Sequence, residues 1–335
     1  MFCKVVGSYT IRSDSDPKEH PVSVVIYRES GMKMEPITVE NIVKKFSFEV
    51  LTGKNYLHRI LKKSKVRRPG LEFMDIFDFI ATEHVQILGK NEINYLHTLT
   101  EEESKLRIGN IVQYDPPCII ITSNQDEPRW LIHYCDEKNI PVLRTHDSTS
   151  EVSAKLDAFV VKAMAPEIAI HGVCVNVSGI GILLRGKSGV GKSETAHTLI
   201  GRGHRLVADD VIVLKKLSPQ TLLGTHNEKN KEFLALRSIG LLNVVRLYGR
   251  ASFQEETRIA LDIELTKWEH NTLNNELELA ERFTEYMGVK IPNIQIQLQP
   301  GRDVAGLIEA AANNWYLKQQ GYSAAEEFVK RLETE

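Results

Sequence analysis

The 335-residue sequence has few cysteines and no long apolar run. Its four cysteines form no Cys-x-x-Cys pair, so their spacing favours neither a zinc site nor a disulfide framework, and reduced, buried thiols are expected. No apolar run approaches the roughly 20 residues that a helix needs to cross a bilayer. The amino terminus lacks the apolar core of a secretory signal. These absences predict a cytoplasmic protein without a membrane partner.

An excess of charge of either sign is also missing. Lysine and arginine number 42 against 44 acidic residues, which leaves a net charge of −2. Such a balance does not favour binding to nucleic acid or to an anionic membrane surface. Hydrophobic residues make up 42% of the chain and charged residues 26%, as in ordinary globular proteins. The length predicts two domains, each with its own core.

The clearest motif is a phosphate loop in the middle of the chain. Residues 186–193 read GKSGVGKS and fit the pattern G-x-x-x-x-G-K-[ST]. A predicted strand over 180–184 precedes it and a predicted helix over 194–200 follows it. Glycines let backbone N–H groups surround phosphate oxygens, and the helix N-terminus adds its positive dipole end. The predicted nucleotide-binding residues are Gly186, Lys187, Ser188, Gly189, Val190, Gly191, Lys192 and Ser193.

Within this loop, two side chains have a predicted task. Lys192 is placed to neutralise the β- and γ-phosphates of a nucleotide, and the Ser193 hydroxyl is placed to bind Mg²⁺. The alternative is a glycine-rich turn between a strand and a helix that binds nothing.

Two adjacent acids follow the loop in an otherwise apolar stretch. Residues 205–214 read RLVADDVIVL, which predicts a buried strand carrying Asp209 and Asp210. Buried carboxylates need partners, and successive strand residues point to opposite faces. We therefore expect different roles for the two acids, with one facing the phosphates. Asp210 follows Ser193 by 17 residues, enough for a helix and a return strand beside the loop. The alternative is a solvated pair of acids at a strand end.

The first half of the chain predicts alternating strands and helices, and hence a covered parallel sheet. A polar extension of unassigned role, residues 1–37, has one predicted strand at 22–27. Thr38 is the predicted cap of a helix over 39–46. The basic run 62–68 is predicted to be a solvated face. The remaining predicted strands are 85–88, 118–122 and 140–144, and the remaining predicted helices are 92–105, 130–138 and 148–164.

The second half predicts a second domain that begins near Ala165. An acidic, polar stretch over 271–286 predicts a surface segment. The helix over 304–318 carries a Leu307/Ala311 stripe that predicts core contacts. An amphipathic helix over 322–332 is expected to pack on its own domain or on a neighbouring subunit. The other predicted strands of this half are 239–245, 259–265 and 294–298.

Taken together, these segments resemble a known family. The stretch HGVCVNVSGIGILLRGKSGVGKSETA, followed by RGHRLVADD, is very similar to the catalytic core of bacterial HPr kinase/phosphorylase. The resemblance covers roughly residues 37–332. It includes RPGL at 68–71, PPCIIIT at 116–122, IPVLR at 140–144 and GLLNV at 240–244. The predicted boundaries are an extension over 1–37, an amino-terminal α/β domain over 38–160 and a kinase domain over 161–335.

The resemblance implies a fold and a reaction. The fold is α/β, with an amino-terminal Mur-ligase-like α/β domain and a carboxy-terminal P-loop kinase domain of the phosphoenolpyruvate-carboxykinase-like type. The reaction transfers the γ-phosphoryl group of ATP, with Mg²⁺, to a serine of the phosphocarrier protein HPr. The reverse activity uses inorganic phosphate to remove that group and releases pyrophosphate. Members of the family are typically homohexamers.

The resemblance also implies roles for individual residues. Lys192 corresponds to the catalytic lysine and Ser193 to a Mg²⁺ ligand. His171 corresponds to the active-site histidine, and Asp210 to the acid/base aspartate with Asp209 beside it. Arg302 corresponds to the last arginine of the segment tied to dephosphorylation.

Several family positions are altered in this chain. Ala235 replaces the glutamate that supplies a second metal ligand, and Glu276 falls near the place of an active-site arginine. Gln297 and Gln299 stand in the dephosphorylation segment. Loss of a cation and gain of an acid weaken phosphate binding, so we expect a serine kinase with weakened phosphorylase activity. The alternatives are a nucleotide-binding regulatory scaffold and a kinase for another acceptor.

Overall fold

The computed structural model describes residues 36–61, 66–69, 83–267, 282–299 and 301–333. Two compact units divide the chain between Met164 and Ala165. Several predicted features lie outside the described residues, namely the extension up to residue 35 with its strand, residues 62–65 of the basic run, and residues 271–281 with Glu276. No helix in the described part of the chain is long and apolar enough to cross a membrane.

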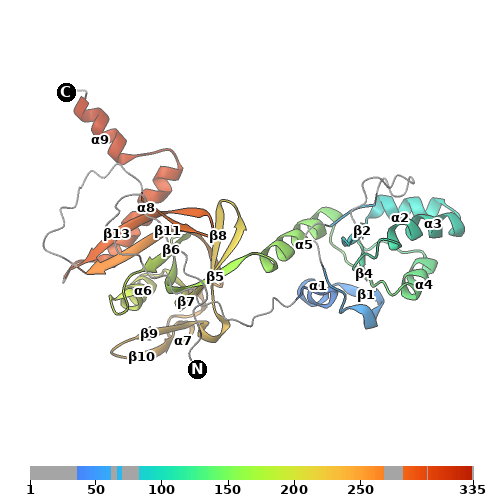
Figure 1. Ribbon diagram of the computed structural model, residues 1–335, viewed down its shortest axis with the longest axis horizontal. Helices are drawn as coiled ribbons and strands as arrows, with labels where there is room; N and C mark the ends of the chain where they lie inside the picture. The colour runs from blue at the N-terminus through green and yellow to red at the C-terminus, as the bar shows by residue number, and fades with distance from the viewer. Residues whose placement is uncertain (1–35, 62–65, 70–82, 268–281, 300, 334–335) are drawn as a thin grey trace. The chain divides into compact units, whose positions relative to one another are not determined.

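The first unit is built on a four-stranded sheet in the order β1-β4-β3-β2, and β1, β2 and β4 are labelled in Figure 1. The three predicted strands are confirmed and run parallel, whereas β1, which the sequence did not predict, is antiparallel to β4. The strands are β1 (Glu49–Thr52), β2 (Gln86–Leu88), β3 (Ile119–Ile121) and β4 (Val142–Arg144). The helices are α1 (Val39–Phe46), α2 (Lys90–Thr98), α3 (Glu101–Val112), α4 (Arg129–Glu137) and α5 (Thr149–Ala163).

Both faces of this sheet are covered, as the unbroken apolar run of β3 predicts. Ile120 joins the cluster that contains residues of α1 and α5. Ile119 and Ile121 join the cluster that contains residues of α2, α3 and α4. All three side chains are fully buried. The expected free, buried thiols are confirmed for Cys118, Cys135 and Cys174, whereas Cys3 lies outside the described residues.

The single helix predicted over 92–105 is wrong, because the chain forms α2 and α3 instead. Thr100 begins α3 with a capping box: its hydroxyl accepts a hydrogen bond from the Glu103 N–H, and the Glu103 carboxylate accepts one from the Thr100 N–H. Such a cap satisfies N–H groups that a continuous helix would satisfy itself. Thr38 caps α1 in the same way, with Asn41 as its partner, and that prediction is confirmed.

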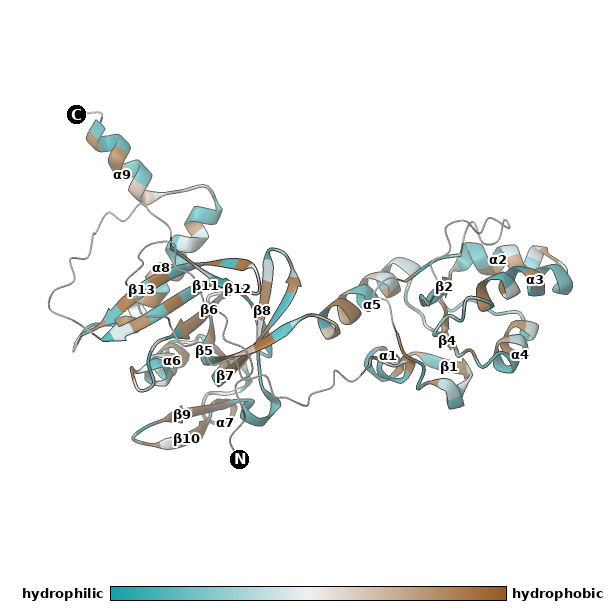
Figure 2. Ribbon diagram, viewed as in Figure 1, coloured by the Kyte–Doolittle hydropathy of each residue, from teal (hydrophilic) through white to brown (hydrophobic). Residues whose placement is uncertain are grey.

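The second unit is built on a seven-stranded sheet in the order β12-β13-β11-β6-β5-β7-β8. Strand β8 also pairs with β11, so β11, β6, β5, β7 and β8 close on themselves. The strands are β5 (Glu167–Val177), β6 (Ile180–Arg185), β7 (Arg205–Ser218), β8 (Thr221–His226), β11 (Glu256–Lys267), β12 (Arg282–Tyr286) and β13 (Val289–Leu298). In Figure 2, hydrophobic residues (brown) gather in the central part of this sheet, around β5 and β7.

Two helices, α6 (Lys192–Gly201) and α8 (Val304–Gln319), pack on one face of this sheet. The face of α8 that is fully buried consists of Ala305, Ile308 and Ala312. Leu307 and Ala311, the predicted stripe, are partly buried beside it. A second apolar cluster fills the inside of the closed strands, with Cys174, Leu183 and Ile212 among its members.

Two predictions in this unit are wrong in part. The strand predicted over 239–245 is β10 (Gly240–Asn243) followed by α7 (Val244–Tyr248), because the Asn243 side chain caps the helix by accepting from the Arg246 N–H. Strand β10 pairs with β9 (Phe233–Leu236) in a hairpin apart from the main sheet. The surface segment predicted up to residue 286 ends in β12, whose Thr284 and Tyr286 are buried.

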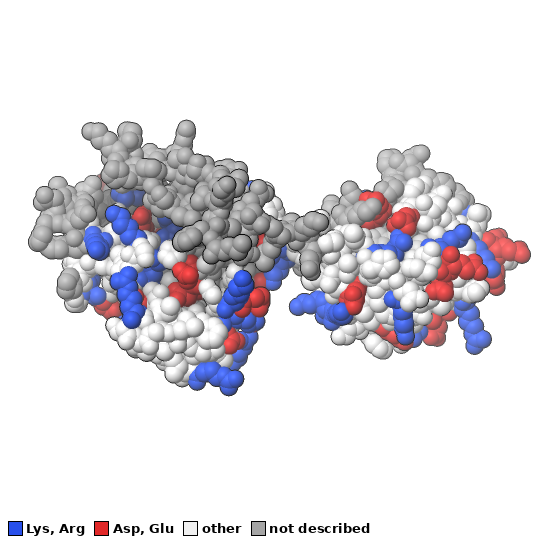
Figure 3. Space-filling model, turned by 60° about the horizontal axis from the view of Figure 1, so that its bottom comes forward, with Lys and Arg blue, Asp and Glu red and all other residues white. Residues whose placement is uncertain are grey.

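The predicted carboxy-terminal helix is α9 (Ala324–Glu333), and no residue of it is buried by the described part of the chain. Tyr322, Phe328 and Leu332 are all exposed. Packing of this helix on its own domain is therefore not observed among the described residues. On the face of the molecule shown in Figure 3, described Lys and Arg side chains are interspersed with Asp and Glu.

Candidate active site

The phosphate loop connects the carboxyl end of β6 to the start of α6. Gly186, Gly189 and Gly191 have φ angles of +140°, +79° and +110°, which residues with a Cβ rarely adopt. A Cβ on Gly186 would also lie 2.3 Å from the carbonyl oxygen of Leu265. The glycine spacing of the motif is therefore what this backbone path requires.

A cavity of about 410 Å³ opens beside this loop. It brings together His171, Lys192, Ser193, Asp209 and Asp210, whereas Arg302 is exposed between β13 and α8 and does not line it. Of the other predicted loop residues, Ser188, Gly189 and Gly191 line the cavity, whereas Gly186, Lys187 and Val190 do not. The lining residues are His171, Gly172, Ser188, Gly189, Gly191, Lys192, Ser193, Glu194, Asp209, Asp210, Lys229, Asn230, Phe233, Ala235, Arg237 and Leu241.

The ammonium group of Lys192 is held against the loop. Its Nζ donates to the carbonyl oxygens of Gly186 at 3.0 Å and Lys187 at 3.3 Å. Burial lowers the pKa of Lys192, and the charges of Asp209 and Asp210 act in the opposite direction. The lysine thus lines the cavity with its ammonium group bonded to the loop backbone.

Ser193 and Asp209 form a hydrogen-bonded pair at the base of the cavity. The Ser193 hydroxyl donates to Asp209 Oδ1 at 2.9 Å, and the Ala235 backbone N–H donates to Asp209 Oδ2 at 2.9 Å. Asp209 is only 4% exposed, and this burial raises its pKa, an effect that the two hydrogen bonds oppose. The expectation that a buried acid has partners is confirmed.

The same pair has the donor set that Mg²⁺ prefers. Hydroxyl and carboxylate oxygens are hard ligands, and phosphate-loop enzymes hold Mg²⁺ with the loop Ser or Thr and an Asp on a neighbouring strand. Residues Ser193 and Asp209 fit that arrangement in chemistry and in placement, since Asp209 lies on β7. The sequence had assigned the ion to Ser193 alone.

Asp210 is paired with His171. The histidine Nδ1 lies 2.9 Å from the Asp210 carbonyl oxygen and 3.0 Å from its Oδ1. Both oxygens are acceptors, so Nδ1 carries the proton and donates. The pair is open to solvent, with the His171 side chain 44% and the Asp210 side chain 63% exposed.

The expectation that one of the two acids faces away from the phosphates is wrong, because both line the cavity. Asp210 has a φ of +67°, which interrupts the alternation of a regular strand. The two acids still differ in surroundings: Asp209 is buried against Ser193, whereas Asp210 is exposed beside His171. Position within the strand did not reveal this, because alternation assumes ordinary β dihedrals.

The sequence reasoning missed several cavity residues, among them three with polar side chains. Lys229 and Asn230 come from the short 3₁₀ helix Glu228–Asn230, and Arg237 comes from the turn of the β9–β10 hairpin. Arg237 lies in the turn two residues beyond Ala235, the altered family position that the sequence had singled out, and this closeness in sequence was the available signal.

Comparison with known proteins identifies the family. Residues 162–332 match the family model "HPr Serine kinase C-terminal domain", and residues 37–160 match "HPr Serine kinase N terminus". The chain belongs to the HPr serine kinase family. The resemblance found in the sequence is confirmed, and the chain is an enzyme of the kinase/phosphorylase type with a mixed α/β fold.

Relatives match almost the whole chain. The "Putative HPr kinase/phosphorylase 2" of Oceanobacillus iheyensis is 63% identical over 300 residues, covering 90% of this chain and 98% of that protein. The "HPr kinase/phosphorylase" of Bacillus cytotoxicus is 36% identical over 299 residues, covering 89% and 97%. A solved structure, the Hpr(Ser) kinase/phosphatase from Coxiella burnetii, is 32% identical, covers 48% of this chain and 97% of its own, and has a TM-score of 0.43.

Proposed function

We propose that this HPr-kinase-family enzyme transfers the γ-phosphoryl group of ATP to a serine of the phosphocarrier protein HPr. The observation that carries the proposal is the single cavity lined by Lys192, by the Ser193–Asp209 pair and by the His171–Asp210 pair. It combines phosphate-binding, cation-binding and proton-accepting groups, which are the parts that phosphoryl transfer needs.

Each of these groups has one task in the reaction. Lys192 and the loop N–H groups hold the phosphates, and Ser193 with Asp209 holds Mg²⁺, which when bound neutralises charge on the phosphate oxygens. Asp210 accepts the proton of the attacking serine hydroxyl. The serine oxygen forms a bond to the γ-phosphorus, the bond to the bridging oxygen breaks, and ADP leaves. The His171 N–H holds the Asp210 carboxylate in place for this step.

We also propose that the forward reaction outweighs the phosphate-dependent reverse reaction. At Ala235 the chain contributes to the site a backbone N–H that is already bonded to Asp209, and no side-chain ligand for a second cation. Arg302 lies outside the cavity lining. A site without a second metal ion and without Arg302 binds inorganic phosphate beside phosphoserine less favourably.

The finer features of the proposal rest on the resemblance to the family. They are domain limits of 38–160 and 161–335, a Mur-ligase-like amino-terminal domain, a phosphoenolpyruvate-carboxykinase-like P-loop kinase domain, a homohexameric assembly and a cytoplasmic location. ATP and Mg²⁺ are the proposed ligands of the cavity.

The test is a transfer assay with the Asp210→Asn variant. Purified protein, HPr and Mg·ATP are incubated, and phosphoserine on HPr is measured by mass spectrometry. We expect transfer by the wild type and a loss of kcat of roughly 10²- to 10⁴-fold in Asp210→Asn, because a proton acceptor contributes about that much. The matched control is Asp126→Asn, an exposed acid of the first unit. Absence of HPr phosphorylation by the wild type, or full activity in Asp210→Asn, would contradict the proposal.

A further inference from the structure

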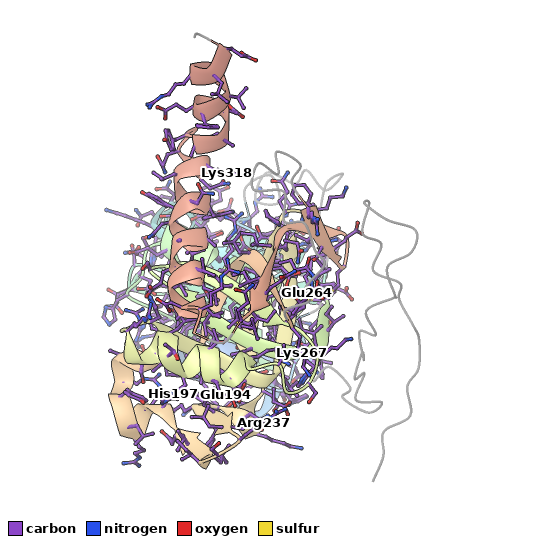
Figure 4. The ribbon with its side chains drawn as sticks, turned by 90° about the vertical axis from the view of Figure 1, so that its left-hand side faces the viewer. Glu194, His197, Arg237, Glu264, Lys267 and Lys318 are labelled. Carbon is purple, nitrogen blue, oxygen red and sulfur yellow. The ribbon has the colours of Figure 1, made fainter. Side chains whose placement is uncertain are left out.

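Arg237 is a cation at the cavity that the proposed mechanism does not use. It lies in the three-residue connection between β9, which ends at Leu236, and β10, which begins at Gly240. In Figure 4, Arg237 is labelled at this hairpin, with Glu194 and His197 on α6 above it. It lines the same cavity as Lys192 and Ser193.

The guanidinium group of Arg237 rests directly on the phosphate loop. A Cβ built on Gly189 would lie 1.7 Å from Arg237 Nη2, 2.6 Å from Cζ and 2.8 Å from Nη1. The arginine thus occupies the space that any larger residue at position 189 would fill. Gly189 also has a positive φ of +79°, so this position excludes side chains for two independent reasons.

The charge of Arg237 is not neutralised by the described part of the chain. No hydrogen bond or ion pair joins it to a described residue, in contrast to Arg250, which pairs with Glu232 and Glu255 in the same unit. The charge of Arg237 also contributes to lowering the pKa of Lys192, although burial is the larger cause. Two cations thus act on one another beside a loop shaped for phosphate, an arrangement that a bound anion stabilises.

The hairpin that carries Arg237 is tied to the site. The Ala235 N–H donates to Asp209, and Leu234 and Leu236 are buried in the cluster that contains α6 residues. Ala235, on β9, and Arg237, the first residue after β9, both line the cavity. Because Arg237 directly follows β9, these contacts of the hairpin hold its backbone beside the site, even though its side chain is exposed.

We infer that Arg237 binds the terminal phosphate of the nucleotide, as an arginine supplied from the hairpin of the same chain. The loop N–H groups surround the inner phosphates, and Lys192 reaches the β- and γ-phosphates. Arg237, on the cavity side of the loop, is therefore placed to contact the γ-phosphate. An arginine presents N–H donors in a planar fork that matches phosphate oxygens. In this role it stabilises the charge on the phosphoryl group during transfer. The inference rests on the proposed function.

The test compares two nucleotides that differ in the terminal phosphate. Dissociation constants of Mg·ADP and of the non-hydrolysable analogue AMP-PNP with Mg²⁺ are measured by calorimetry on the full chain. We expect Arg237→Ala to weaken AMP-PNP binding roughly 10- to 100-fold and to leave ADP binding unchanged. Arg237→Lys keeps the charge but loses the planar pair of N–H donors, so its affinity for AMP-PNP is expected to lie between those of the wild type and Arg237→Ala. Arg246→Ala is the matched control, an exposed arginine on α7 that does not line the cavity.

Each outcome decides the inference. Equal weakening of both nucleotides, or no change in either, overturns it. Since the Arg237 side chain is exposed, the melting temperature of the free variant is expected to match the wild type, and a large drop would show a structural role instead. Failure of the proposed function gives a different result. If the wild-type protein binds AMP-PNP but does not phosphorylate HPr, HPr is not the acceptor. The comparison of nucleotide binding by wild type and Arg237→Ala still tests the role of Arg237.

Discussion

At the scale of single residues, burial and hydrogen-bond partners give two neighbouring acids of the site different properties. Asp209 and Asp210 are adjacent in sequence, yet one is 4% exposed and bonded to Ser193, and the other is open to solvent beside His171. A buried carboxylate with a hydroxyl partner suits a cation. An exposed carboxylate beside a histidine N–H suits proton transfer.

The buried acid leads to a prediction about stability. Burial raises the pKa of Asp209 above its ordinary value of 3.8, so the folded state binds this proton more tightly than the unfolded state. Its contribution to stability therefore falls as the pH rises from 3.8 through the raised pKa, and it is unfavourable at neutral pH without a cation. We expect Asp209→Asn to melt at or above the wild-type temperature in metal-free buffer at pH 7.

Adding Mg²⁺ should reverse that order. A ligand that binds only the folded state raises the melting temperature, so the wild type should gain with Mg²⁺ concentration while Asp209→Asn should not. Thermal melts over a Mg²⁺ titration measure this, and an equal gain in both proteins would show that the ion binds elsewhere. Asp126→Asn, in the first unit, is the control for loss of one acid.

At the scale of elements, the loop is anchored by the strand before it. Arg185, the last residue of β6, donates from Nε and Nη2 to the two carboxylate oxygens of Asp262 on β11, each at 2.6 Å. Thr284 on β12 accepts from the same guanidinium, and Tyr286 and Asn293 donate to Asp262. Burial alone would lower the pKa of Arg185, but the Asp262 charge more than offsets it and the pKa is raised. Four strands thus meet where the loop begins.

Breaking this buried pair is expected to be costly. The Asp262 side chain is 0% and the Arg185 side chain 10% exposed, so either residue left alone is an unpaired buried charge. We expect Asp262→Leu and Arg185→Met each to lower the free energy of unfolding by about 3–5 kcal/mol. The double variant should cost clearly less than the sum, because it removes both charges. Urea unfolding of the wild type, the two single variants and the double variant measures the four free energies of unfolding. If the loss in the double variant equals the sum of the two single losses, the residues are not coupled.

At the scale of the whole molecule, α9 presents apolar side chains that the described part of its own chain does not bury. Phe328 and Leu332 are 49% and 57% exposed. With the proposed homohexamer, we expect these side chains to contact a neighbouring subunit. A Phe328→Glu/Leu332→Glu double variant should therefore lower the assembly mass in sedimentation equilibrium. Glu326→Gln, on the same helix, is the control, and an unchanged mass in the double variant would exclude α9 from the subunit contact.

Local pattern was sufficient for most elements of this fold. Period and capping residues predicted α1, α4, α5 and the central strands, because short-range hydrogen bonds and apolar alternation determine them. The failures share one cause: the break at Thr100, the start of α7 at Asn243 and the burial of β12 each depend on a competing cap or a distant strand. Strand β1 was missed because its place depends on pairing with β4, far along the chain.

The sequence alone determined the phosphate loop, since glycines at 186, 189 and 191 are required by a backbone with positive φ. It also determined the return of two acids to that loop, through the spacing of one helix and one strand. Only the tertiary structure decided that the Ala235 N–H binds Asp209, that Asp210 turns to His171, and that Arg237 lies on Gly189. These contacts join strands, a hairpin and a loop distant in sequence, and a local pattern carries no information about which distant groups meet.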